Sequence, residues 1–253
     1  MAELSSFDGT ILYYEEEGAG SPVVLLHGLS SSTKGNWKDP GIWAVLVRAG
    51  HRVIGLDARG HGLSAKPHDP AAYEDGAPEK DVAALLDHLG LVETDLVGYS
   101  MGAGTALRFA ASDSRLRRLV LGGIGGDPKK WGAPPEGSGA SMQQRWLAGL
   151  EADDPNSIED PVARGARKVF ESRGNDLKAI AALLRSNRQH LSSDIDLESL
   201  KAPTLVVCGD KDASPKELAE ALPDGRSLVL EGDHEGVVAN PALAEAIAEF
   251  LAA

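Results

Sequence analysis

The chain has 253 residues, enough for one domain that buries roughly 75% of the surface its unfolded form would expose. It carries 38 acidic and 25 basic residues, a formal net charge of −13. Such a surface repels phosphate backbones and anionic lipid headgroups, so we expect no nucleic acid and no membrane among its partners.

Cysteine usage and the first residues bear on the compartment. The single cysteine, Cys208, has no internal disulfide partner and lies in the apolar run 205–208, so we interpret it as a small buried hydrophobe. The first ten residues show no signal-peptide pattern, and no run approaches the roughly 20 apolar residues of a membrane span. We therefore expect a cytoplasmic protein, and the composition is compatible with a homo-oligomer.

Short apolar runs predict a parallel sheet. A turn at Asp8-Gly9 and β-forming residues at 10–15 predict an opening hairpin. Six further runs are apolar without alternation, which is typical of strands covered on both faces; they lie at 23–26, 53–56, 96–97, 119–121, 204–207 and 227–230.

Helical patterns separate these runs at 81–89 and 103–111, and a last amphipathic helix is expected at 242–251. This alternation predicts a doubly wound α/β sheet. It breaks between 126 and 199, where helix-like segments occur at 143–151, 162–171 and 177–189 without a strand signal. We predict a core of residues 1–125 and 200–253, with 126–199 as a helical insertion.

The strongest chemical signal is Gly98-Tyr99-Ser100-Met101-Gly102, between an expected strand and an expected helix. In G-x-S-x-G the serine occupies a sharp strand-to-helix turn that exposes its hydroxyl as a nucleophile. The helix that follows supplies free amides and a positive dipole end. We therefore predict that Ser100 is a nucleophile; the alternative is a glycine-rich turn that happens to contain a serine.

A second signal is His27-Gly28-Leu29 at the end of the first predicted parallel strand. Acyl transfer by a serine needs two amide donors for the tetrahedral oxyanion. We expect these donors to be the backbone N–H groups of Leu29 and Met101. His27 itself is expected to fix the loop and not to carry a proton.

Together with residues 57–64, Asp-Ala-Arg-Gly-His-Gly-Leu-Ser, these motifs make the chain resemble the α/β-hydrolase superfamily, especially its esterase, non-haem haloperoxidase and C–C hydrolase members. The resemblance covers essentially the whole chain. It implies a mostly parallel, doubly wound sheet with a short helical cap inserted after the strand that ends near Leu121. It also implies that Asp57, Arg59 and His61 are structural.

The family order of nucleophile, acid and base locates two more residues by resemblance. Asp212 falls on the acid of a turn similar to the family's G-x-x-D-x-x-x-P, although one residue is missing before the proline. Asp210 and Asp127 are the competing candidates. His234 lies in the loop after the last predicted strand, where the family carries its base.

The cap of such a fold covers the active site, and its larger apolar side chains are candidates for the substrate pocket. We predict substrate contacts for Trp131, Met142 and Trp146, with packing inside the cap as the alternative; Phe170 fits packing better. No metal-ligand spacing and no dinucleotide-binding motif occurs, so neither a metal nor a cofactor is expected.

These residues predict a serine hydrolase that acts on small to medium carboxylic esters or lactones through an acyl-enzyme. Aspartate-dependent dehalogenases and epoxide hydrolases of the superfamily do not match Ser100. A thioesterase, a perhydrolase or a C–C hydrolase would use the same residues, and a ligand-binding member without turnover is the alternative from another class.

Overall fold

The computed structural model describes residues 2–131, 141–186, 191 and 194–252. Its eight-stranded sheet has the order β1-β2-β4-β3-β5-β6-β7-β8, with β1–β2 and β2–β4 antiparallel and all other pairs parallel. The expected hairpin and mostly parallel sheet are thereby confirmed. The strands are β1 Ala2–Ser5, β2 Ile11–Glu17, β3 Pro22–Leu26, β4 Arg52–Asp57, β5 Thr94–Tyr99, β6 Leu116–Gly122, β7 Thr204–Gly209 and β8 Gly225–Leu230.

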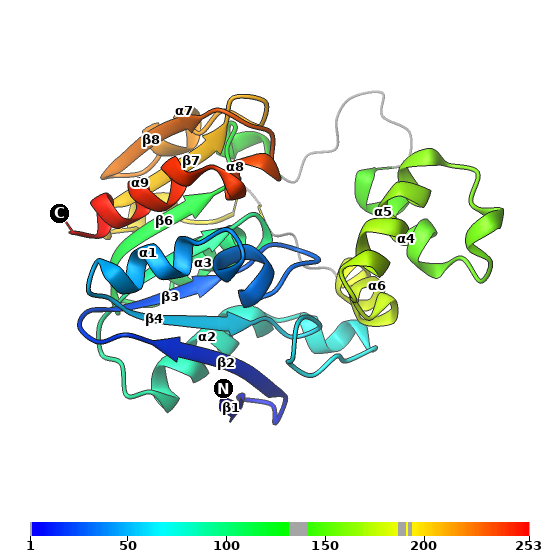
Figure 1. Ribbon diagram of the computed structural model, residues 1–253, viewed down its shortest axis with the longest axis horizontal. Helices are drawn as coiled ribbons and strands as arrows, with labels where there is room; N and C mark the ends of the chain where they lie inside the picture. Colours follow the sequence, from blue (N-terminus) through cyan, green and yellow to red (C-terminus); the bar gives the residue numbers. More distant parts are fainter. Residues whose placement is uncertain (1, 132–140, 187–190, 192–193, 253) are drawn as a thin grey trace.

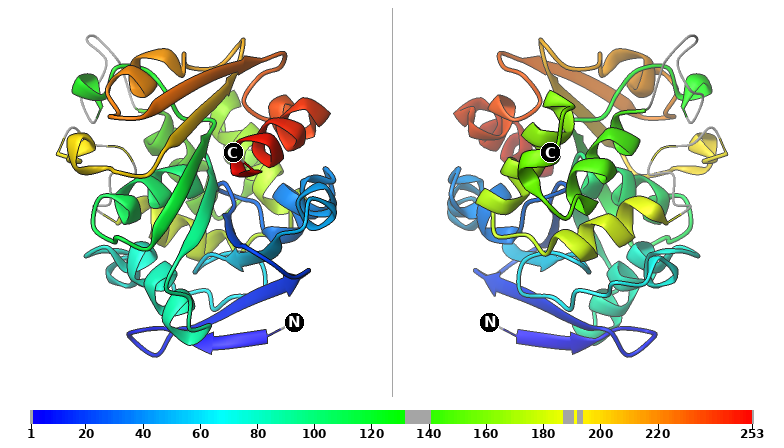
Figure 2. Two further views of the ribbon diagram at one scale, coloured as in Figure 1. Left: turned by 90° about the vertical axis from the view of Figure 1, so that its left-hand side faces the viewer. Right: turned by 90° about the vertical axis from the view of Figure 1, so that its right-hand side faces the viewer.

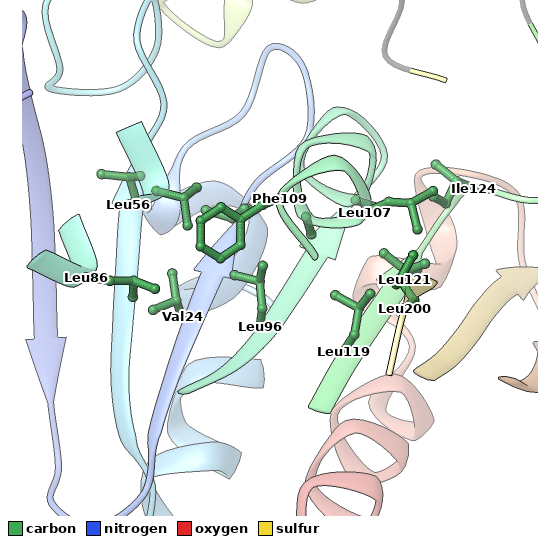
Figure 3. Packing of buried hydrophobic residues seen from close by; sticks show 14 of the residues in the cluster. Val24, Leu56, Leu86, Leu96, Leu107, Phe109, Leu119, Leu121, Ile124 and Leu200 are labelled. Atoms are coloured by element: carbon green, nitrogen blue, oxygen red, sulfur yellow. The ribbon is translucent and has the colours of Figure 1, made fainter. Parts of the chain in front are cut away.

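Helices cover both faces of the sheet (Figures 1 and 2), as the doubly wound prediction requires. One face packs against α2, α3 and α7, and the other against α1, α8 and α9. Figure 3 shows the first of these layers, where Phe109 and Leu107 of α3 lie over Leu96 and neighbouring strand residues. The helices are α1 Ile42–Arg48, α2 Ala77–His88, α3 Met101–Ala110, α7 Lys216–Glu220, α8 Gly236–Ala239 and α9 Pro241–Ala252.

The central strands are apolar on both faces because both faces are covered. In β5, Leu96 faces the α3 layer and Val97 the opposite layer, and every residue of the strand is buried. The expectation of a strand covered on both faces is wrong for β8. This strand is the edge of the sheet and is only partly covered, which leaves Val229 55% exposed.

Between β6 and β7, the described residues contain helices and no strand. Helices α4 Met142–Glu151, α5 Pro161–Ser172 and α6 Leu177–Arg185 form a separate group at the carboxyl ends of the parallel strands (Figure 1). Ser141, Asp160 and Asp176 cap their N-termini through side-chain oxygens. The predicted extension of the last helix to 189 enters residues outside the described ones. We refer to these three helices and the turns between them as the cap.

The cap has a small apolar core of its own, built from Leu150, Phe170, Ile180, Ala181 and Leu184. The expected packing role of Phe170 agrees with this position. The larger core includes Cys208, which is fully buried and donates from Sγ to the carbonyl of Ile124 at 3.1 Å; burial raises the pKa of this thiol to about 12. None of the described helices is long and apolar enough to cross a lipid bilayer.

Candidate active site

Ser100 lies on the turn between β5 and α3 with φ of +52°, a conformation that costs energy for a residue with a side chain. The two flanking glycines make this turn possible. A Cβ on Gly102 would lie 2.1 Å from the carbonyl oxygen of Leu26, and a Cβ on Gly98 would lie 2.4 Å from that of Gly102. The backbone on either side of the serine is therefore packed too closely for any residue other than glycine at positions 98 and 102.

Three side chains from three strand ends form a hydrogen-bonded chain. Nε2 of His234 lies 2.9 Å from Oγ of Ser100, and its Nδ1 lies 2.6 Å from Oδ2 of Asp212. Ser100 follows β5, Asp212 follows β7 and His234 follows β8. All three therefore lie at the carboxyl ends of the parallel strands (Figure 1). An ionised carboxylate only accepts, so Nδ1 carries the proton and Nε2 is free to accept from the serine hydroxyl.

The two competing aspartates make other contacts. Oδ1 of Asp210 accepts from the amide of Gly232 at 2.9 Å, in the loop after β8 and not in the loop that follows Asp210 itself. Asp127 accepts from the amide of Lys129 at 3.0 Å and caps a short turn. Of these three aspartates, Asp212 is the one that contacts His234.

Tyr99 also contacts His234. Its hydroxyl donates to the carbonyl oxygen of His234 at 2.5 Å, and the two rings lie 5.5 Å apart. Burial raises the pKa of Tyr99, so the hydroxyl stays a donor. Sequence reasoning missed this residue because the position before the serine is variable in the motif; a large polar aromatic there was the available signal.

The amides of Leu29 and Met101, the two expected oxyanion donors, have no acceptor of their own within the described residues. The carbonyl of Gly28 belongs to the same peptide unit as the Leu29 amide, and it accepts from Nδ1 of His27 at 2.8 Å and from the amide of Ser31 at 3.2 Å. In a trans peptide the N–H points away from the carbonyl, so these contacts turn the Leu29 amide outward.

The tautomer of His27 follows from its second contact. Nε2 accepts from the amide of Ala58 at 3.0 Å, so Nδ1 carries the hydrogen that Gly28 accepts. Burial lowers the pKa of His27, which keeps the ring neutral. Oδ1 of Asn36 accepts from the Gly28 amide at 2.9 Å. This histidine holds the loop, as the sequence predicted, and its two ring nitrogens are occupied by Gly28 and Ala58.

Residues 57–64 also make structural contacts. Asp57 accepts from the amides of Thr33 and Leu63, at 2.7 and 2.9 Å. Arg59 is buried and pairs with Asp81 at 2.6 Å, and the ring of His61 lies edge-on to that of His27. These contacts hold the loops that surround the serine.

A cavity of about 890 Å³ opens at Ser100 and His234. The cap contributes the turn 172–175 to its wall. None of the predicted contact residues Trp131, Met142 and Trp146 is among the described residues that line this cavity. Met142 is 53% exposed, Trp146 packs against Phe170 inside the cap, and Trp131 packs against the main core with its indole N–H on the carbonyl of Gly125.

Two other cap residues reach the site, and sequence reasoning missed both. The guanidinium of Arg173 donates to Oγ of Ser30 and to Glu235, each at 2.8 Å. The side-chain amide of Asn175 donates to the carbonyl of Ser30 at 3.0 Å. Ser30 follows Leu29 and Glu235 follows His234, so one cap turn holds the neighbours of an amide donor and of the histidine.

Known proteins are similar to this chain in sequence and in fold. The sequence matches the family of the alpha/beta hydrolase fold over residues 21–251. The chain belongs to the alpha/beta-hydrolase family. It is 36% identical to a non-heme haloperoxidase of Rhodococcus erythropolis over 84% of this chain and 82% of that protein.

Relatives of this alpha/beta hydrolase are named for different activities. A 2-hydroxymuconate semialdehyde hydrolase of Pseudomonas putida is 31% identical over 78% of this chain and 72% of that protein. The structure of an esterase from a Rhodococcus species superposes with a TM-score of 0.77 at 27% identity, covering 100% of this chain and 98% of the other. The protein is thus a hydrolase. Among its described residues, no three His, Cys, Asp or Glu side chains gather where they could hold a metal ion.

Proposed function

We propose that the protein is a serine hydrolase of small to medium carboxylic esters or lactones, with Ser100 as nucleophile, His234 as base and Asp212 as acid. The observation that carries the proposal is the hydrogen-bonded chain from Asp212 through His234 to Ser100, beside two backbone amides that donate to no acceptor within the described residues. A nucleophile, a base within hydrogen-bond reach and a group that orients the base are the parts that acyl transfer requires.

In the first half-reaction, Oγ of Ser100 attacks the acyl carbon while Nε2 of His234 takes the hydroxyl proton. The carbonyl oxygen becomes an oxyanion and accepts from the amides of Leu29 and Met101, each of which is expected to contribute roughly 10²–10³ in turnover. The bond between the acyl carbon and the alcohol oxygen then breaks. The alcohol leaves with the proton held by His234, and the acyl group stays on Ser100.

In the second half-reaction, water attacks the acyl carbon and His234 takes its proton. The bond to Oγ of Ser100 breaks, the serine regains its proton, and the carboxylic acid leaves. Asp212 accepts from Nδ1 throughout and stabilises the charged imidazole. Each step uses only these residues and water, so the proposal includes no cofactor and no metal.

The relatives support an ester in different degrees. The esterase from Rhodococcus acts on the proposed bond type, whereas the relative from Pseudomonas putida cleaves a semialdehyde. A thioester or a carbon–carbon bond next to a ketone would meet the same residues, and both are outcomes of the test below.

The test is labelling and turnover with one control variant. A fluorophosphonate should modify Ser100, located by peptide mass spectrometry, and p-nitrophenyl acetate should be hydrolysed by the native chain and not by Ser100→Ala. A panel of ester, thioester, lactone and β-diketone then identifies the bond. An adduct on another serine would contradict the nucleophile, and a folded protein with no turnover on the whole panel would indicate a ligand-binding member of the fold.

A further inference from the structure

The base of the proposed triad follows the least covered strand of the parallel part of the sheet. His234 comes after β8, the edge strand, in which Val229 is 55% exposed. Ser100 comes after β5, which lies between β3 and β6 and is buried along its whole length. A loop after a thinly packed edge strand is expected to move more than a turn in the middle of the sheet. The 2.9 Å contact between Nε2 and Oγ therefore needs a bond that connects the two segments.

Tyr99 makes such a connection from the centre of the sheet. It is the last residue of β5, and its side chain is 4% exposed. Its hydroxyl donates to the backbone carbonyl of His234 at 2.5 Å, and the two rings lie 5.5 Å apart. Because Tyr99 and Ser100 are consecutive, one stretch of backbone determines the position of the nucleophile and of the hydroxyl that holds the base.

The ring of Tyr99 passes the end of β6, where two glycines leave room for it. A Cβ on Gly122 would lie 2.6 Å from Cδ2 of Tyr99, and a Cβ on Gly123 would lie 2.9 Å from its Cζ and 3.0 Å from Cε1 of His234. The backbone of Gly122 has no positive φ that would require glycine. The missing side chain at this position is therefore explained by the ring that packs against it.

The other bonds of the loop act on the neighbours of His234. Asp210 accepts from the amide two residues before the histidine, at 2.9 Å. Glu235, the next residue, pairs with Arg173, but the two side chains are 70% and 37% exposed, and exposed ion pairs hold their partners weakly. The bond from Tyr99 comes from a buried side chain and acts on His234 itself.

We infer that Tyr99 is a positioning residue of this hydrolase, whose hydroxyl holds the backbone of His234 so that Nε2 stays within reach of Ser100 in both half-reactions. The inference rests on the proposed function and assigns a role to a position that the nucleophile motif leaves open. The bond to Asp212 orients the imidazole ring, whereas the bond from Tyr99 fixes the backbone that carries the ring. The base is thus held from β7 and from β5.

The experiment removes single hydroxyl groups. Tyr99→Phe keeps the ring and loses the bond to His234. Tyr73→Phe is the matched control, because Tyr73 is also buried and its hydroxyl also donates to a backbone carbonyl, that of Pro67 at 2.7 Å. kcat and KM for p-nitrophenyl acetate are measured for the native chain and both variants, and complete fluorophosphonate labelling counts the active molecules in each sample.

Tyr99→Phe should lower kcat about tenfold, the upper end of what one hydrogen bond contributes. KM should stay within about twofold, because both half-reactions use His234 and slow together. Tyr73→Phe should leave kcat within about twofold of the native value, since its bond is of the same kind but does not hold the base. An unchanged kcat in Tyr99→Phe, equal losses in both variants, or a raised KM at unchanged kcat would overturn the inference.

A measurement without substrate separates this inference from the proposed function. The proton on Nδ1 of His234 lies in a short hydrogen bond to Asp212 and gives a far-downfield NMR resonance when that bond is shielded from water. The resonance should be sharp in the native chain and in Tyr73→Phe, and broadened or lost in Tyr99→Phe. The same resonance in all three would overturn the positioning role, whereas a native chain that shows the resonance and hydrolyses no ester would overturn the proposed function alone.

Gly122→Ala tests the path of the ring. Its Cβ would displace Tyr99 and should lower kcat about as much as Tyr99→Phe does. Because both changes act on one hydrogen bond, the double variant should lose at most about twofold more than Tyr99→Phe alone. Losses that multiply in full would show that Gly122 acts elsewhere and would overturn this part of the inference.

Discussion

The turn at Ser100 and the cap hold their residues by different means. At the turn, backbone lies against backbone: Gly102 approaches the carbonyl of Leu26 so closely that no side chain fits between them. In the cap, side chains such as Phe170 and Leu184 pack against one another. The sheet therefore determines where the reacting atoms lie, whereas side-chain packing determines what lies beside them.

The largest expected effect tests the sheet side of this comparison. Asp212→Asn should lose at least two orders of magnitude in kcat, because the imidazole can then adopt the wrong tautomer; the equivalent change in a well-studied serine protease costs about 10⁴. Asp210→Asn and Asp127→Asn should stay within about tenfold of the native rate, since each bonds a backbone amide away from His234.

All three variants need thermal melts that establish folding before their rates are compared. A near-normal Asp212→Asn beside an inactive Asp127→Asn would move the acid to the end of β6 and leave Ser100 and His234 in their roles.

Two glycine substitutions should have the next largest effect. They should change the free energy of unfolding in opposite directions in the two regions. Gly102→Ala should destabilise the protein by about 1–3 kcal/mol or more, because its Cβ would meet the Leu26 carbonyl at 2.1 Å. Gly165→Ala, inside α5 of the cap, meets nothing within 4 Å and should stabilise by about 0.5–1 kcal/mol. Urea unfolding measures both, and a harmless Gly102→Ala would contradict the close backbone packing.

Much of this division was predictable from sequence. The strand ends at Ser100, Asp212 and His234 are marked by short apolar runs followed by motif residues, and the sheet brings these ends together. The edge exposure of β8 was not predictable, because a run such as 227–230 has the same composition in an edge strand and in a covered one.

The substrate side was predictable only in outline. Trp131 and Trp146 are large and apolar, so the sequence indicates that they pack but does not indicate their neighbours. Trp131 packs against the main core, and Trp146 packs against Phe170. Arg173 and Asn175 reach the site from the turn after α5. Such orientation depends on tertiary packing and leaves no local pattern.

Acid should affect the core before the cap. Burial lowers the pKa of His27, so below pH 6.5 the unfolded chain binds a proton that the folded core refuses, and stability falls by at most about 1.4 kcal/mol per pH unit. Arg145 lowers the pKa of Asp160 to about 2, so the contribution of this pair is present above pH 4 and is lost as the pH falls towards 2.

Melting temperatures from pH 7 to pH 3 check both windows. His27→Gln should flatten the decline between pH 7 and 5, and Arg145→Gln should change only the range below pH 4. An unchanged slope in His27→Gln would show that another group titrates there.

The smallest effect concerns the contact between the two regions. Arg173→Gln should lower kcat by about fivefold at most, because an exposed ion pair contributes at most about 1 kcal/mol. Arg185→Gln breaks a cap ion pair with Glu151, is matched in chemistry, and should leave kcat unchanged. The drop should appear in kcat and not in KM if Arg173 acts by holding Ser30 and Glu235. Equal effects of both variants on kcat would show that the Arg173 contact contributes only to the general stability of the cap.

The lone thiol offers a practical route to watching the cap move. Cys208 is fully buried, its sulfur donates to Ile124, and burial raises its pKa to about 12, so maleimides and iodoacetamide find almost no thiolate at neutral pH. A cysteine introduced at Val169, which is 42% exposed on α5, would therefore be the single reactive thiol of the protein. A fluorophore or spin label attached there would report on the cap during turnover, and Cys208 would not have to be replaced first.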